Sequence, residues 1–61
     1  MNIPQDPFIL LSFINTKLRD EYKSIDDLCK SLNINRMQLE SDLASIDYTY
    51  TKEQNRFTQV R

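Results

Sequence analysis

The middle of this 61-residue chain reads Leu28-Cys29-Lys30-Ser31-Leu32-Asn33-Ile34-Asn35. Leu28 and Leu32 are four positions apart, so they lie on one face of a helix. Asn33 tolerates the left-handed conformation that ends many helices, and Asn35 is a good N-cap for a following helix. The stretch therefore predicts helices at about 25–32 and 36–46, joined by a short turn that suits a steep crossing.

The sequence on both sides of this turn supports the two helices. Ser24 precedes the first helix, and Asp27 follows three positions later, which is typical of a capping box. The residues expected to face inward are Ile25, Leu28, Cys29, Leu32, Leu39, Leu43 and Ile46.

An amphipathic helix is predicted at about 7–22. Asp6 is a good N-cap, and Pro7 suits the first helical position because its missing N–H would be unpaired there. Asn15 is polar amid apolar neighbours, and we expect its amide to bond the backbone of a nearby loop; a ligand contact is the alternative. The apolar stripe, with spacings of three and four, consists of Leu11, Ile14, Leu18 and Tyr22.

The last part of the chain changes from helical spacing to strand composition. Residues 48–51 and 56–60 are rich in β-branched and aromatic side chains, and a polar loop at 52–55 separates them. This pattern predicts a β-hairpin over about 48–60. Pairing Thr51 with Arg56 sets Tyr50 opposite Phe57, and such an aromatic cross-strand pair stabilises a hairpin.

These elements predict one mainly α domain over 1–61, with three helices and a C-terminal β-hairpin (α+β), in the style of a winged helix–turn–helix. The central stretch resembles the L-A-x-x-L-G-V-S core of helix–turn–helix proteins, with Cys29 in place of Ala and Asn33 in place of Gly. The predicted core is Leu11, Ile14, Leu18, Leu28, Leu32, Ile34, Leu39, Leu43, Ile46 and one of Tyr50 or Phe57.

Four further strings are similar to one small bacterial family, the domain-of-unknown-function family 4250. They are N-I-P-Q-D-P (2–7), L-L-S-F-I-N-T-K-L-R-D (10–20), Y-T-Y (48–50) and N-R-F (55–57). The resemblance covers almost the whole chain and implies a protein of about this length that stands alone. It implies no activity, and it transfers no catalytic or binding residues.

Composition excludes most enzyme chemistry. The chain has no glycine and no histidine, so it contains no P-loop, Rossmann fingerprint, nucleophile elbow or Ser–His pair. We expect no enzyme, no cofactor and no metal site. A single Cys29 favours a reducing compartment, and we expect this thiol to be buried and inert. The longest strictly apolar run is 8–11, far short of a membrane span, so the chain is expected to be cytoplasmic.

Two kinds of partner are consistent with the sequence. Ile9 and Phe13 are four positions apart and point away from the main stripe, which indicates a homodimer or a protein partner that contacts this helix. The alternative for this pair is that Met1, Ile3 and Pro4, or the hairpin, cover it.

DNA binding is the second hypothesis, because the order of elements suggests it. Arg36, Gln38 and the hairpin residue Arg56 would then contact DNA. The charge argues against it: eight Lys and Arg stand against nine Asp and Glu, and the pI is about 5.1. We therefore expect a non-catalytic interaction or regulatory module, with a DNA-binding regulator as the alternative.

Overall fold

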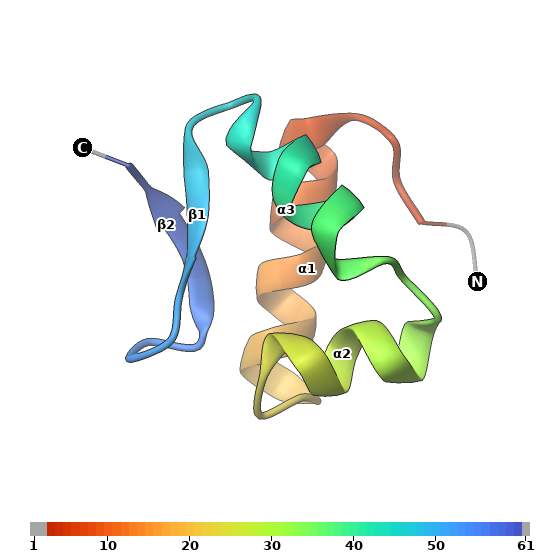
Figure 1. The fold of residues 1–61 in the computed structure, drawn as a ribbon. Coiled ribbons are helices and arrows are strands. Elements are labelled where there is room, and N and C mark those ends of the chain that lie inside the picture. Colours follow the sequence, from red (N-terminus) through yellow and green to blue (C-terminus); the bar gives the residue numbers. More distant parts are fainter. Residues whose placement is uncertain (1–2, 61) are drawn as a thin grey trace.

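A computed structural model describes residues 3–60 as three helices followed by a two-stranded hairpin (Figure 1). The elements are α1 (Pro7–Asp20), α2 (Ile25–Leu32), α3 (Arg36–Ala44), β1 (Tyr48–Thr51) and β2 (Arg56–Gln59). The predicted mainly helical α+β class is confirmed. The bounds of α2 agree with the prediction, whereas α1 and α3 each end two residues earlier than predicted.

Side-chain caps set the helix ends. The oxygen atoms of three N-cap side chains accept from backbone N–H groups: Asp6 from Phe8 and Ile9, Ser24 from Asp27, and Asn35 from Gln38. Asn33 ends α2 in the left-handed conformation, with φ 57° and ψ 47°. All four predicted caps are therefore confirmed, and each follows from the local preference of its residue type.

The two early helix ends have a local cause. At the end of α1, the N–H groups of both Glu21 and Tyr22 donate to the carbonyl of Lys17, which closes the last turn. After α3, Ile46 N–H donates to Leu43 and Asp47 has φ 65°, so the chain has already left the helical path. Ile46 was predicted to be helical and instead lies in this turn.

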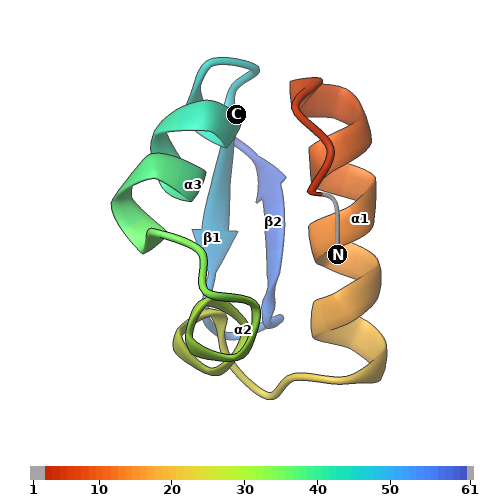
Figure 2. The same cartoon turned by 90° about the vertical axis from the view of Figure 1, so that its right-hand side faces the viewer.

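The helices flank the hairpin in a fixed order. Figure 2 shows α3, β1, β2 and α1 side by side, with α2 across one end. The strands are antiparallel, with Thr51 paired to Arg56 and Tyr50 to Phe57, which confirms the predicted register. The Tyr50 and Phe57 rings are tilted at 59°, with centroids 5.7 Å apart. α1 therefore lies beside β2, and α3 lies beside β1.

The core lies between the helices and one face of the hairpin. Its buried members are Leu10, Ile14, Leu18, Ile25, Leu28, Cys29, Leu39, Leu43 and Phe57. Of the predicted aromatic pair, Phe57 is fully buried and Tyr50 only partly.

Four predicted core residues are only partly buried, namely Leu11, Leu32, Ile34 and Ile46. In α1 the buried position belongs to Leu10 instead of Leu11. The cause is the orientation of the helix: Asn15 faces the backbone of β2, and Leu11 is one turn earlier on the same side. Leu11 therefore lies at the rim of the hairpin, while Leu10 turns into the core.

Candidate functional site

Asn15 joins α1 to the edge of β2. Its Oδ1 accepts from the Phe57 N–H at 2.8 Å, and its Nδ2 donates to the Phe57 carbonyl at 3.1 Å. The side-chain amide thus takes the place of a peptide group in a neighbouring strand. The predicted contact of Asn15 with backbone is confirmed, although the backbone belongs to a strand and not to a loop.

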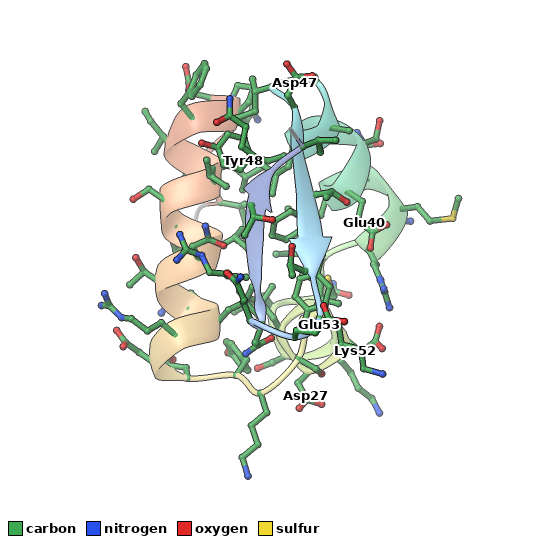
Figure 3. The ribbon with its side chains drawn as sticks, turned by 90° about the vertical axis from the view of Figure 1, so that its left-hand side faces the viewer. Asp27, Glu40, Asp47, Tyr48, Lys52 and Glu53 are labelled. Atoms are coloured by element: carbon green, nitrogen blue, oxygen red, sulfur yellow. The ribbon has the colours of Figure 1, made fainter. Side chains whose placement is uncertain are left out.

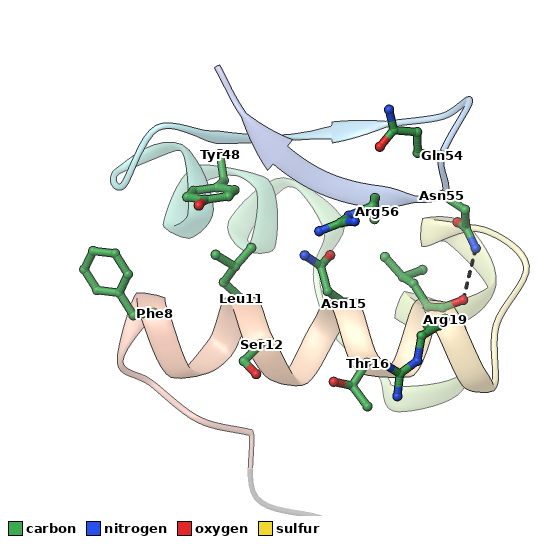
Figure 4. A pocket seen from close by; sticks show the side chains of 11 residues that line it. Phe8, Leu11, Ser12, Asn15, Thr16, Arg19, Tyr48, Gln54, Asn55 and Arg56 are labelled. Atoms are coloured by element: carbon green, nitrogen blue, oxygen red, sulfur yellow. Dashed lines mark hydrogen bonds between the residues drawn. The ribbon is translucent and has the colours of Figure 1, made fainter. Parts of the chain in front are cut away.

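A hollow of about 720 Å³ lies beside this contact, between α1 and the hairpin (Figure 4). One end is apolar and is formed by Phe8, Leu11 and Tyr48. The rest is polar, with Ser12, Asn15, Thr16, Arg19, Gln54 and Arg56 among its lining residues. The hollow therefore combines an aromatic surface with hydrogen-bond donors, as binding surfaces commonly do.

The charge in this hollow is positive. None of the side chains that line it within residues 3–60 is Asp or Glu. Arg19 is held by its neighbour Asp20, with Nε 2.8 Å from Oδ1 and Nη2 3.0 Å from Oδ2. This bidentate contact lowers the pKa of Asp20 below its usual value. Arg56 makes no ion pair with any residue that the structure describes.

The residues predicted to contact DNA are not brought together. Arg36 at the start of α3 donates from Nη1 to Asp26 Oδ1 at 2.5 Å and from Nε to Glu40 Oε2 at 2.8 Å. These two bonds, to Glu40 and to Asp26, raise the pKa of Arg36. Gln38 donates from Nε2 to Asp42 Oδ1 at 2.9 Å.

Both side chains on α3 are therefore bonded to carboxylates, whereas Arg56 lines the hollow beside α1. The Arg36–Glu40 pair could have been read from its spacing of four. The bond to Asp26 joins two helices, and only the crossing of α2 and α3 reveals it.

The predicted interface residues on α1 differ in exposure. Ile9 is 59% exposed, whereas Phe13 is partly buried and packs against the core, with Lys17 Nζ 5.7 Å from its ring centroid. Phe8, which lies outside the apolar stripe predicted for this helix, is 65% exposed. The exposed apolar pair is thus Phe8 and Ile9.

The described part of the N-terminal segment, which the sequence offered as a cover for Ile9 and Phe13, leaves Ile9 59% exposed. Ile3 and Pro4 line a second, smaller hollow with Leu10, Ile34 and Leu39. Ile3 is partly buried against the core. Met1, which was considered as a cover, lies outside the described residues.

Cys29 lies buried on α2, and burial raises the pKa of its thiol. Within residues 3–60, no group of three or more His, Cys, Asp or Glu side chains is placed to hold a metal ion. No helix in the same range has the length and apolar character needed to cross a membrane.

Figure 3 shows several acidic residues, among them Asp27, Glu40 and Glu53, on the side of α2, α3 and the hairpin turn. This side lies away from α1, the helix that borders the hollow.

Comparison with known protein families identifies a family for this chain. The model of the family described as "Domain of unknown function (DUF4250)" matches residues 4–57. No curated protein and no solved structure matches the chain. The winged helix–turn–helix classification and a bacterial origin therefore stay predictions.

Proposed function

The chain belongs to the family of the domain of unknown function DUF4250, and we propose that it is a non-catalytic interaction module that contacts a protein partner through α1 and the adjoining hollow. Family membership brings no activity with it. The proposal therefore depends on the surface that the described residues form.

The observation that carries the proposal is the exposure of Phe8 and Ile9 on the first turn of α1. Phe8 also lines the apolar end of the hollow, beside Leu11 and Tyr48. Adjacent exposed apolar side chains with a polar surround mark interaction surfaces in many soluble proteins. Burial of such an aromatic ring by a partner removes apolar area from water and favours association.

A second copy of the chain is one candidate for this partner. In such a homodimer the α1 helices would meet through Ile9 and Phe8. Phe13 would contribute less than the sequence predicts, because it packs against the core under Lys17. Sedimentation of the purified chain measures this directly, and an Ile9→Asp variant should sediment as a folded monomer.

A non-catalytic role is supported by the chemistry of the hollow. The chain has no histidine, and its one cysteine is buried on α2 rather than near the hollow. No carboxylate lines the hollow within residues 3–60. A nucleophile with an adjacent base is the usual requirement for covalent catalysis, and this surface supplies no such pair.

Binding of DNA through α3 and the hairpin is the alternative. It would use Arg36, Gln38 and Arg56. Two features weigh against it: Arg36 and Gln38 are bonded to carboxylates, and the pI of about 5.1 is far from the basic range of DNA-binding domains.

Site-specific photo-crosslinking in the cells that make the protein tests the proposal. A benzophenone amino acid replaces Phe8 in one variant and Met37 in the other; Met37 is 81% exposed on α3 and serves as the control. We expect a discrete protein adduct at position 8 that is absent at position 37. No protein adduct at position 8, or the same adducts at both positions, would contradict the proposal.

A further inference from the structure

We propose that the hollow between α1 and β2 accepts a segment of a different polypeptide that carries an acidic side chain near a large apolar one. This inference rests on the proposed function and names the chemistry of the partner. The acidic group would meet Arg56, and the apolar group would pack between Phe8, Leu11 and Tyr48.

The charge pattern supports an acidic ligand. Lys17, Arg19 and Arg36 each bond a carboxylate of their own chain. Arg56 has no such partner within residues 3–60, and it is exposed at the hollow. Lys23, Lys30 and Lys52 also make no ion pair within residues 3–60, but none of them lines the hollow. Arg56 is therefore the guanidinium to which a ligand carboxylate can bind in a bidentate manner.

The hydrogen bonds around Arg56 leave it available for this role. The Asn15 amide, which lies beside it in Figure 4, bonds the N–H and the carbonyl of Phe57, and the Arg56 side chain makes no hydrogen bond with Asn15. Ser12 and Thr16 are exposed on the same side of α1 and add hydroxyl donors. A carboxylate in this position would meet donors and no competing negative charge.

The two parts of the hollow define a spacing. Phe8 and Asn15 are seven residues apart on α1, which corresponds to roughly 10 Å along the helix axis. Figure 4 shows the Phe8 ring at one end of the hollow and Arg56 near Asn15. An extended peptide covers roughly 10 Å in three residues. The expected segment therefore has its apolar and acidic residues three positions apart.

A second copy of the chain fits this hollow poorly. Most of its acidic side chains are already bonded within the chain, including Asp20, Glu21, Asp26, Glu40 and Asp42. Asp6 caps α1. The remaining acids are Asp27, Asp47 and Glu53, and none lies within three positions of an exposed large apolar side chain in residues 3–60. This favours a different polypeptide as the occupant.

The test is an NMR titration of the ¹⁵N-labelled protein with short capped peptides. The probe is acetyl-Trp-Ser-Ser-Glu-amide. One control peptide has Gln in place of Glu, and the other has Ala in place of Trp. We expect the probe to shift the amides of Phe8, Ser12 and Arg56, with a dissociation constant on the order of millimolar. Each control peptide should bind roughly fivefold more weakly, because each loses one of the two contacts.

Matched protein variants locate the charge contact. Arg56→Gln should weaken the probe roughly fivefold, as for an exposed ion pair. Lys52→Gln removes the same charge from the same hairpin but from outside the hollow, and it should bind as the wild type does. The spectrum of each variant shows whether it is folded before the titration begins.

Three results would overturn the inference: no shifts around the hollow with the probe, equal binding by Arg56→Gln, or stronger binding of an oligothymidylate than of the peptide. A sedimentation experiment that shows self-association lost in Arg56→Gln would also overturn it, because the occupant would then be a second copy. Failure of the crosslink at position 8 contradicts the proposed function itself. A crosslinked partner that binds Arg56→Gln normally contradicts only the present inference.

Discussion

Asn55 in the hairpin turn donates to the carbonyl of Leu18, 37 residues earlier in the chain, at 3.2 Å. The same amide nitrogen donates to the Tyr22 carbonyl at 3.0 Å, and Oδ1 accepts from the Tyr50 hydroxyl at 2.6 Å. The carbonyl groups at the end of a helix lack partners within the helix. Asn55 therefore holds the hairpin turn to the end of α1, and Asn15 holds β2 to the middle of the same helix.

Replacement of Asn55 should separate the contribution of its side-chain hydrogen bonds to stability from that of its left-handed backbone conformation. Asn55→Ala removes these bonds and also replaces a residue type that tolerates the left-handed conformation at φ 51° with one that adopts it less readily, so we expect a loss of about 1–3 kcal/mol in the free energy of unfolding. Asn55→Gly removes the bonds but adopts this conformation freely, and it should be more stable than the Ala variant by up to about 1 kcal/mol. Thermal denaturation of the three proteins measures both differences. Equal stability of wild type and Ala variant would show that the bonds from Asn55 contribute nothing.

Phe57 should be the most sensitive position of the hairpin. It is fully buried, and truncation of a buried Phe to Ala typically costs about 3–5 kcal/mol. A chain of 61 residues has a small core, so Phe57→Ala should be largely unfolded at room temperature, as judged by circular dichroism.

The control for this position is Tyr50→Phe, which keeps the cross-strand ring and loses only the bond to Asn55. It should cost about 1 kcal/mol. A Phe57→Ala variant that melts close to wild type would show that the hairpin is not part of the cooperative core.

Features that depend on local chemistry could be predicted from the sequence. The caps at Asp6, Ser24 and Asn35 each use a side chain and a backbone group two or three residues away, so residue type and spacing are sufficient. The hairpin register likewise follows from the aromatic pair and the length of the loop. Asn33 is a further case, because few residues adopt its left-handed conformation easily.

Features that depend on how the elements pack could not be predicted in this way. The rotation of α1 that buries Leu10 and leaves Leu11 only partly buried is set by the bond between Asn15 and the Phe57 backbone, 42 residues away. The helical spacing alone allows either leucine to face the core. The bond from Arg36 to Asp26 depends in the same way on the crossing of two helices. The hollow, which needs residues from both α1 and the hairpin, has no signal in either segment alone.

Cys29 should react slowly with thiol reagents in the native protein. Its side chain is buried, and burial raises the pKa of the thiol, so the reactive thiolate is scarce at neutral pH. Modification at pH 8 should be at least tenfold slower than in denaturant, since it requires local opening. The control is Lys30→Cys in a Cys29→Ala background, which places an exposed thiol on the same helix and should react at the denatured rate. Fast native modification of Cys29 would contradict its burial.

Binding of a fluorescent mixed-sequence duplex, titrated from low to physiological salt, decides between the two classes of partner. We expect no appreciable binding at physiological salt, because Arg36 is held by Asp26 and Glu40 and a phosphate would have to displace both carboxylates. Arg36→Gln should accordingly leave any weak binding at low salt unchanged, and it should lower stability by only about 0–1 kcal/mol per exposed ion pair lost. Duplex binding of Arg56→Gln, measured in the same way, shows whether the hollow contributes to any binding at low salt. Strong duplex binding that falls steeply with salt and is lost in Arg36→Gln would instead identify α3 as a DNA-binding helix and would contradict the protein-interaction function proposed for α1.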